Sequence, residues 1–361
     1  MNKFKIAVIG DQFMKASAFT DALAKVPGLD AAVRTMELPW PDQPMRHGYV
    51  DGGLPGLREY LGEPDDIVRF VDGAEILINH LAPINGDILD RLPALKLIAV
   101  SRGGPVNIDV AACKARKVKL VNTPGRNSSA VAEFTIAAIL AETRLIRAGH
   151  ESLRQGVWRG DLYRFDKIDA ELSEMTVGLI GYGHIGTKVV RLLKPFGCRI
   201  LVCDPYVPLS TEDREGDVEQ VDLDTLLTRS DVVTLHVPLT PATRGLIGAR
   251  ELALLGPDGV LINTARGGVV DEEALARALA GGGLRAAAID VFEQEPPAGT
   301  PLAALPNCIL TPHVAGLSVG AMTGMLDVAA ASVVAVLAGR EPPGRIVNAP
   351  LAAVRREADA P

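Results

Sequence analysis

Three polar side chains interrupt apolar stretches of this sequence and could do chemistry together. Arg266 follows "VLINTA", Glu295 lies in "DVFEQEP" and His313 lies in "TPHVAG". A guanidinium can bind a carboxylate through two hydrogen bonds, a histidine can move a proton near neutral pH, and a carboxylate can orient that imidazole. Each residue alone could equally be structural, as a satisfied histidine or as half of an ion pair. As a set they meet the needs of hydride transfer from a 2-hydroxy acid, and we predict catalytic roles for all three.

A glycine-rich turn predicts a second property, dinucleotide binding. Gly181, Gly183 and Gly186 form G-x-G-x-x-G. The first glycine permits a tight turn, the second lets the backbone approach a pyrophosphate, and the third lets the following helix pack close to the strand. Asp204 ends the next predicted strand, where a carboxylate would bind both hydroxyls of an adenine ribose and repel a 2′-phosphate. An ordinary glycine turn is the alternative, but the order of turn, helix, strand and acid favours NAD as the cofactor over NADP.

The elements that must position these residues are short apolar strands that alternate with longer amphipathic segments, which is the pattern of a parallel α/β sheet. Strands are predicted at 176–180 and 199–203, with a helix between them. Four more are predicted in "DVVTLHVP", "GVLINTA", "AAAIDVF" and "CILTPH". Together they make the six strands that a complete dinucleotide-binding sheet requires.

The first part of the chain repeats this alternation less regularly. Strands are predicted in "KIAVIG", "AEILIN", "LKLIAV" and "VKLVN", and helices in "DVAACKARK" and "SSAVAEFTIAAILAETRLIRAG". This pattern predicts a smaller, flavodoxin-like α/β domain. The end of the chain predicts one more helix and an extended segment, which we expect to return to that first domain.

Composition limits the class of protein. A chain of 361 residues suits about two domains, and its net charge of −7 argues against general nucleic-acid binding. The four cysteines are far apart and form no disulfide or zinc pattern, so we expect no metal site and a reducing cytoplasm. The apolar stretch 328–338 is too short to span a membrane. We therefore expect a soluble cytoplasmic α/β protein without nucleic-acid or membrane partners.

Six stretches spread over nearly the whole chain are more specific than the glycine turn alone. They are "NTPGRNSSAVAE" (122–133), "GLIGYGHIG" (178–186), "HVPLTPATRGLI" (236–247), "NTARGGVVDEEAL" (263–275), "AIDVFEQEP" (288–296) and "LTPHVAG" (310–316). In order and spacing they resemble the D-isomer-specific 2-hydroxyacid dehydrogenase family, to which phosphoglycerate dehydrogenase, glyoxylate reductase and D-lactate dehydrogenase belong.

The resemblance implies an NAD-dependent enzyme that interconverts a D-2-hydroxy acid and its 2-keto acid. Arg266 would bind the substrate carboxylate and keto oxygen, His313 would be the acid/base, and Glu295 would pair with His313 and raise its proton affinity. Gly267 and Gly268 would leave room for substrate and nicotinamide beside Arg266.

The resemblance also implies a discontinuous domain layout. A Rossmann NAD-binding domain of residues 124–314 would be inserted into a flavodoxin-like substrate-binding domain made of residues 1–123 and 315–361. The implied cofactor-binding residues are Gly181, Gly183, His184, Ile185, Gly186, Asp204, His236, Thr264, Ala265, Asp290 and Gly316. Asp290 would meet the nicotinamide carboxamide, and its alternative role is a helix or turn cap.

One loop departs from the family pattern. Many members read G-x-G-x-D-N-I-D where this chain reads "SRGGPVNID" (101–109). Gly103 and Gly104 can still offer backbone amides to a substrate carboxylate. Arg102 could be a second cationic contact for a phosphorylated or polyhydroxy sugar acid, or a surface arginine beside a tight turn. His80, in "INHLAPIN", could hydrogen-bond substrate hydroxyls or be structural.

The sequence also leads to expectations about oligomeric state and regulation. The helix at 129–146 is apolar on more than one side, which fits a homodimer interface or simple burial inside the monomer. Too little chain follows His313 for the C-terminal regulatory domain of some phosphoglycerate dehydrogenases. The competing hypothesis is a corepressor-like protein of the same fold, which would sense NAD(H) without catalysis.

Overall fold

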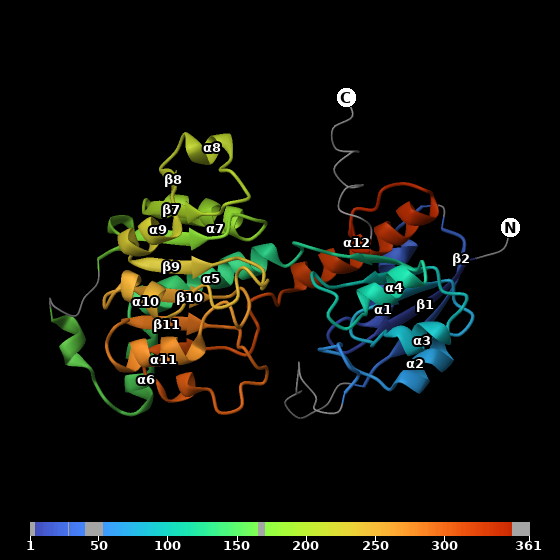
Figure 1. Ribbon diagram of the computed structural model, residues 1–361, viewed down its shortest axis with the longest axis horizontal. Helices are drawn as coiled ribbons and strands as arrows, with labels where there is room; N and C mark the ends of the chain where they lie inside the picture. The colour runs from blue at the N-terminus through green and yellow to red at the C-terminus, as the bar shows by residue number, and fades with distance from the viewer. Residues whose placement is uncertain (1–3, 28, 40–52, 165–169, 349–361) are drawn as a thin grey trace. The chain divides into compact units, whose positions relative to one another are not determined.

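A computed structural model describes residues 4–27, 29–39, 53–164 and 170–348 of the chain (Figure 1). The chain forms two compact units. Unit 1 contains residues 1–127 and 318–361, and unit 2 contains residues 128–317. Unit 2 is therefore inserted into the chain of unit 1.

Unit 1 is built on a sheet with the strand order β13-β5-β4-β3-β1-β2, parallel except at β13. Its strands are β1 (Phe4–Gly10), β2 (Ala31–Glu37), β3 (Ile76–Asn79), β4 (Leu97–Val100), β5 (Lys119–Asn122) and β13 (Arg345–Ile346). Its helices are α1 (Ala16–Ala24), α2 (Pro64–Val71), α3 (Gly86–Asp90), α4 (Val110–Ala115) and α12 (Val319–Leu337). The order of β5 to β2 is that of flavodoxin-like folds.

Helices cover both faces of the unit 1 sheet. Buried side chains of α1 and α12, such as Phe19 and Val333, pack on one face, and those of α2, α3 and α4, such as Ile67 and Ile88, pack on the other. Because both faces are covered, β3 and β4 are buried at every position. Strand β2 was not predicted, because its seven residues are mostly exposed at the sheet edge and therefore lack an apolar pattern.

Unit 2 is built on an entirely parallel sheet with the order β12-β11-β10-β9-β6-β7-β8. Its strands are β6 (Thr176–Ile180), β7 (Arg199–Cys203), β8 (Val218–Gln220), β9 (Val232–Leu235), β10 (Val260–Asn263), β11 (Ala286–Ile289) and β12 (Cys308–Leu310). The sheet has seven strands where six were predicted, because β8 has only three residues, two of them exposed. The doubly wound order is that of a Rossmann dinucleotide-binding domain.

The α-helices of unit 2 are α5 (Ser128–Thr143), α6 (Ile146–Arg154), α7 (Gly186–Leu193), α8 (Thr211–Arg214), α9 (Leu223–Arg229), α10 (Ala249–Leu255) and α11 (Glu272–Ala280). Short 3₁₀ helices are η1 (Gly160–Tyr163), η2 (Leu172–Glu174), η3 (Lys194–Phe196) and η4 (Pro301–Ala304). The predicted helix at "DEEALARALAG" is α11, which the Asp271 side chain caps through the Ala274 N–H at 2.9 Å. The long helix predicted after residue 128 is instead broken into α5 and α6 at Leu145, whose φ of +58° is left-handed.

One helix corrects an expectation about apolar length. Among the described residues, α12 alone is long and apolar enough to cross a membrane, although half of its most apolar window is buried in the structure. The expectation that the apolar stretch at 328–338 is too short was wrong as to length, because α12 begins at Val319 and the glycine and threonine residues in its first half do not make it polar overall. Its buried residues pack against α1 and the sheet of unit 1.

Candidate active site

The glycine turn lies between β6 and α7, and each of its glycines has a different reason to be there. Gly181 has a φ of +102°, and a Cβ there would lie 2.6 Å from the carbonyl oxygen of His236. A Cβ at Gly186 would lie 2.2 Å from the Gly181 carbonyl oxygen. A Cβ at Gly183, in contrast, would meet no described neighbour within 4 Å. The first and third glycines therefore close the turn, and the second leaves bare backbone facing open space.

This turn fits the diphosphate of a dinucleotide. The backbone N–H groups of Gly183, His184 and Ile185 have no acceptor among the described residues, and they lie just before the first residue of α7. Free N–H groups at a helix N-terminus, together with the helix dipole, attract phosphate oxygens. Gly183 and His184 are exposed, whereas Ile185 is half-buried.

Asp204 follows β7 at the same edge of the sheet. Its carboxylate accepts N–H groups from Tyr182 at 2.8 Å, Tyr206 at 2.8 Å and Val207 at 3.0 Å. Two carboxylate oxygens offer about four acceptor positions. Three are used by the protein, so the carboxylate is held in place and can still accept a hydrogen bond from a ribose hydroxyl.

His236 lies behind the glycine turn, after β9. Thr234 Oγ1 lies 3.1 Å from its Nε2, and its Nδ1 is buried without a hydrogen-bond partner among the described residues. Burial lowers the pKa of His236 to about 3, so the ring is neutral. The predicted cofactor residues Thr264 and Ala265 are buried just after β10, and Gly316 is half-buried near the end of unit 2.

Arg266 is held at the carboxyl end of β10 by a turn that Asn263 closes. The Asn263 side chain accepts the Ala265 N–H at 3.1 Å and donates to the Arg266 carbonyl oxygen at 3.2 Å. Desolvation lowers the pKa of the Arg266 guanidinium, and the negative charge of Glu295 opposes that shift. An arginine keeps its proton in proteins, so Arg266 presents a positive charge near Glu295.

Gly267 corrects the expected reason for the glycines beside Arg266. A Cβ at Gly267 would lie 1.8 Å from the Phe292 carbonyl oxygen, so the backbone after β11 already fills the space that was expected to admit a ligand. Gly268 has a left-handed φ of +71°. Gly267 therefore lets the segments that carry Arg266 and Glu295 pack directly against each other, and Gly268 permits the left-handed backbone that follows it.

His313 and Glu295 form a hydrogen-bonded pair. His313 Nδ1 lies 2.8 Å from Glu295 Oε2, and the side chains are 40% and 15% exposed. Burial raises the pKa of Glu295, but the hydrogen bond and charge of His313, the Phe292 N–H and the charge of Arg266 outweigh it, so that pKa lies below its ordinary value. An ionised carboxylate only accepts, so Nδ1 donates and Nε2 is left without a partner among the described residues.

Asp290 shapes the turn that presents His313. Its buried carboxylate accepts the Thr311 hydroxyl at 2.6 Å and the N–H groups of Val314 and Ala315, each at 2.9 Å. Its carbonyl oxygen accepts the His313 N–H at 2.8 Å. His313 has a φ of +54°, a conformation that persists only where its surroundings impose it. The alternative role of Asp290 as a turn cap is therefore present in the structure.

The predicted substrate residues of unit 1 all follow strand ends. Arg102 forms an ion pair with Glu59, whose carbonyl oxygen it also contacts at 3.0 Å. Gly103 and Gly104 follow it, and a Cβ at either would meet no described neighbour within 4 Å. His80 Nδ1 lies 2.6 Å from Asp11 Oδ2, with side-chain exposures of 9% and 0%.

Four residues that hold these groups were not predicted. Asn263 and Thr311 belong to motifs that were quoted, and a polar residue at a buried strand end was the available signal. Glu59 and Asp11 pair with Arg102 and His80 from distant parts of the chain. No pattern of neighbouring residues predicts ion pairs or hydrogen bonds between segments so far apart in the sequence.

Comparisons with known proteins show which family this chain is similar to. Residues 136–315 match the model for "D-isomer specific 2-hydroxyacid dehydrogenase, NAD binding domain". A glycerate dehydrogenase from Methylorubrum extorquens is 38% identical over 326 residues, which is 89% of this chain and 96% of that protein. A D-3-phosphoglycerate dehydrogenase from Methanocaldococcus jannaschii is 41% identical over 273 residues, which is 75% of this chain and 50% of that protein. The chain thus spans about half the length of this relative.

Solved structures show the same fold. A structure of the TT0316 protein from Thermus thermophilus superposes with a TM-score of 0.74 and 31% identity, covering 95% of this chain and all of that one. The fold and these relatives define an NAD-binding oxidoreductase of the two-unit α/β class. The chain belongs to the D-isomer specific 2-hydroxyacid dehydrogenase family.

Proposed function

We propose that this chain interconverts a D-2-hydroxy acid and its 2-keto acid with NAD as the redox partner. The observation that carries the proposal is the 2.8 Å pair of His313 and Glu295, with the charged Arg266 close enough to lower the pKa of Glu295. A proton-transfer group, its orienting carboxylate and a carboxylate-binding cation thus belong to one compact unit that also carries the glycine turn.

Each residue of the set has a distinct part in the proposed mechanism. NAD, when bound, supplies the nicotinamide that accepts or returns the hydride. Arg266 binds the substrate carboxylate through its guanidinium. Nε2 of His313 takes the proton from the substrate hydroxyl during oxidation and returns it to the carbonyl oxygen during reduction. Glu295 accepts the Nδ1–H bond, which fixes the ring and stabilises the imidazolium that forms.

The cofactor part of the proposal rests on the glycine turn and Asp204. The free N–H groups of residues 183–185 would hold the diphosphate, and the remaining acceptor position of Asp204 would take a hydroxyl of the adenine ribose. His184, Ile185, His236, Thr264, Ala265 and Gly316 are proposed to line the rest of this site, with Asp290 meeting the carboxamide in addition to capping its turn.

The domain roles follow from the two folds. We assign NAD binding to unit 2 and substrate selection to unit 1, whose bounds lie within a few residues of the expected domains, 124–314 and 1–123 with 315–361. Gly103 and Gly104 have space for backbone approach by a carboxylate. Arg102 is neutralised by Glu59, so contact with a phosphorylated or polyhydroxy substrate would require exchange of that ion pair. His80 would need to present Nε2 from its buried pair with Asp11.

A homodimer through unit 2 is the proposed assembly. The apolar residues of α5 pack largely inside unit 2, which accounts for the apolar helix at 129–146 without a partner. Large exposed apolar side chains follow it instead. They are Ile146, Leu153, Val157, Trp158 and Tyr163, exposed by 57%, 57%, 47%, 73% and 74%. Exposed apolar side chains that form one contiguous patch are typical of an interaction surface.

The decisive test is a panel of 2-keto acids with NADH, read by the loss of NADH fluorescence. Glyoxylate, hydroxypyruvate, pyruvate and a phosphorylated hydroxy-keto acid cover the substrate classes of the relatives. An enzyme oxidises NADH with at least one of them, and an Arg266→Ala variant loses that turnover but still binds NADH. Binding of NADH without turnover of any panel member would favour the corepressor-like alternative. No observation described above supports that alternative.

A further inference from the structure

A buried tyrosine lies inside the glycine turn. Tyr182 stands between Gly181 and Gly183 and is only 2% exposed, although Gly183 itself is exposed. Its hydroxyl donates to the carboxylate of Asp213 and lies 3.4 Å from the Ser210 Oγ. The side chain therefore ties the turn to the start of α8.

Asp213 is a charged anchor for that hydroxyl. Its carboxylate forms an ion pair with Lys194, which begins η3 directly after α7. Burial raises the pKa of Asp213, but hydrogen bonds from Lys194, Tyr182 and Ser210 outweigh it and hold the pKa below its ordinary value. The phenol thus donates to an ionised acceptor, which gives a stronger hydrogen bond than a neutral one.

Tyr182 also contacts the other end of the same loop. Its backbone N–H donates to Oδ2 of Asp204 at 2.8 Å, while Oδ1 accepts from Tyr206 and Val207. From β8, the Gln220 side chain donates to the Asp204 carbonyl oxygen at 2.8 Å. The segment 204–213 is therefore attached to Tyr182 at both ends, through the N–H at Asp204 and through the hydroxyl at Ser210 and Asp213.

We propose that Tyr182 is a positioning residue that sets both affinity for NAD and discrimination against NADP, because its hydroxyl holds Asp204 in register with the glycine turn. The inference rests on the proposed role of Asp204 toward the adenine ribose. The Asp204 carboxylate is held by three N–H donors and cannot move away from the 2′-phosphate of NADP. The electrostatic repulsion between the two negative groups is therefore not relieved. A residue needed only to fill the core would not require the hydroxyl, since phenylalanine has nearly the same volume.

The test compares Tyr182→Phe with the native chain. Dissociation constants for NADH and NADPH are measured by fluorescence titration without a keto acid, and KM and kcat are measured with an accepted keto acid. The variant loses the charge-assisted hydrogen bond from the Tyr182 hydroxyl to Asp213. Because this loss affects the nucleotide only through the position of Asp204, NADH binding should weaken about fivefold. NADPH binding should weaken less or improve, so the preference for NADH falls, while kcat at saturating NADH stays unchanged.

Matched variants separate positioning from general loosening. Thr143→Val removes another buried hydroxyl of unit 2, which donates to the Ile139 carbonyl oxygen at 2.9 Å in α5 and has no link to Asp204. This variant should leave the ratio of the dissociation constants for NADH and NADPH as in the native chain. Asp213→Asn keeps an acceptor for the phenol but loses the ion pair with Lys194, and it should shift the ratio in the same direction as Tyr182→Phe.

Two outcomes would overturn the inference, and they differ from failure of the proposed function. Equal affinities of Tyr182→Phe and the native chain for both nucleotides would remove the role of the hydroxyl. Equal weakening toward both would reduce Tyr182 to a structural residue. Asp204→Asn reports on the underlying assumption: if it does not change the NADH to NADPH ratio, the ribose assignment of Asp204 fails, whatever the Tyr182 variant does.

Discussion

Each unit of this protein carries a histidine hydrogen-bonded to a carboxylate near the carboxyl end of its parallel sheet, yet the two pairs differ in access. In unit 2, His313 and Glu295 are 2.8 Å apart and the histidine side chain is 40% exposed. In unit 1, His80 and Asp11 are 2.6 Å apart and the histidine side chain is 9% exposed. The hydrogen bond is similar in both, so it is exposure that separates a group able to meet a substrate from one enclosed by its own fold.

The surroundings of His80 explain why it is enclosed. Phe13 stacks on its ring with centroids 5.3 Å apart, and Asp11 also accepts the N–H groups of Phe13 and Met14 at 2.8 Å each. Asn107 donates to the His80 carbonyl oxygen at 3.1 Å. The His80 pair therefore organises the loops after β1 and β3. The His313 pair, in contrast, leaves Nε2 free among the described residues.

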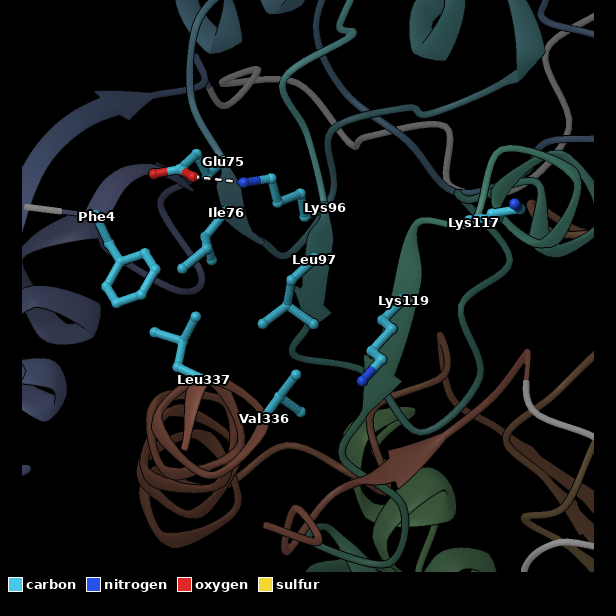
Figure 2. Close-up of a pocket in the computed structure, with 9 residues that line it drawn as sticks. All are labelled: Phe4, Glu75, Ile76, Lys96, Leu97, Lys117, Lys119, Val336 and Leu337. Atoms are coloured by element: carbon cyan, nitrogen blue, oxygen red, sulfur yellow. Dashed lines mark hydrogen bonds and ion pairs between the residues drawn. The ribbon is translucent and has the colours of Figure 1, made fainter. Parts of the chain in front are cut away.

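The position of a hollow relative to the sheet also differs from that of the candidate site. Unit 1 contains a hollow of about 250 Å³. Figure 2 shows that its lining includes Lys96, which pairs with Glu75, and the apolar side chains of Leu97 and Leu337. The hollow lies at the amino ends of β3, β4 and β5. Open α/β sheets bind their ligands at the opposite, carboxyl ends. Position in the sheet therefore outweighs the presence of a hollow when a catalytic site is assigned.

Replacing His313 should have the largest effect. In His313→Gln the ring and its proton-transfer role are lost, so kcat/KM should fall about 10²- to 10⁴-fold while NADH binding persists. Steady-state kinetics and fluorescence titration measure the two. The matched variant His80→Asn should keep turnover of glyoxylate within about tenfold of the native value. A variant of His313 with full activity would refute the proposed mechanism.

Replacing Glu295 should affect both catalysis and the pH dependence of stability. The pKa of Glu295 is lowered in the folded chain, so its ionised form adds stability above the ordinary glutamate value of about 4.3, and this is lost as the pH falls through the folded value. Glu295→Gln should therefore lower the melting temperature at pH 7, and this difference should shrink at an acidic pH below the ordinary glutamate value. Calorimetry at both pH values checks this, and kcat should fall at pH 7 because the imidazolium loses its partner. An equal difference in melting temperature at both pH values would contradict the assignment.

Replacing Asp11 should affect stability more than chemistry. Asp11→Ala leaves the N–H groups of Phe13 and Met14 and the His80 ring without their acceptor, at about 1–3 kcal/mol for each buried donor. Denaturant unfolding should show a lower free energy of unfolding, while kcat on glyoxylate changes little. If KM rises only for hydroxylated keto acids, His80 contacts substrate hydroxyls. Unchanged stability would instead show that the pair does not organise its loops.

Replacing Arg102 should have the smallest effect. Because Glu59 already neutralises its charge, Arg102→Ala should change kcat/KM for glyoxylate by less than about threefold. A selective loss on phosphorylated substrates, with Glu59→Gln improving them, would show that Arg102 exchanges its partner for the substrate. Equal small losses on every substrate would leave Arg102 as a support for its loop.

Local patterns were sufficient for much of the fold. The glycine turn, the buried strands of both sheets and helix α11 each carry their signal in consecutive residues, as alternation, glycine spacing or an acidic first turn. The family assignment, which six motifs in order predicted, is confirmed by the relatives. Strands β8 and β2 were not predicted, because a short or exposed edge strand needs no apolar run.

The sequence by itself determined which chemical groups are present, their order along the chain and the sheets that end beside them. Only the tertiary structure decided which groups have access and partners. Gly267 is required by the Phe292 backbone, Asp290 caps the turn of His313, and His80 is enclosed by Asp11 and Phe13. The physical reason is that burial and hydrogen bonding depend on segments that are distant in sequence and adjacent in space, and no local pattern contains that information.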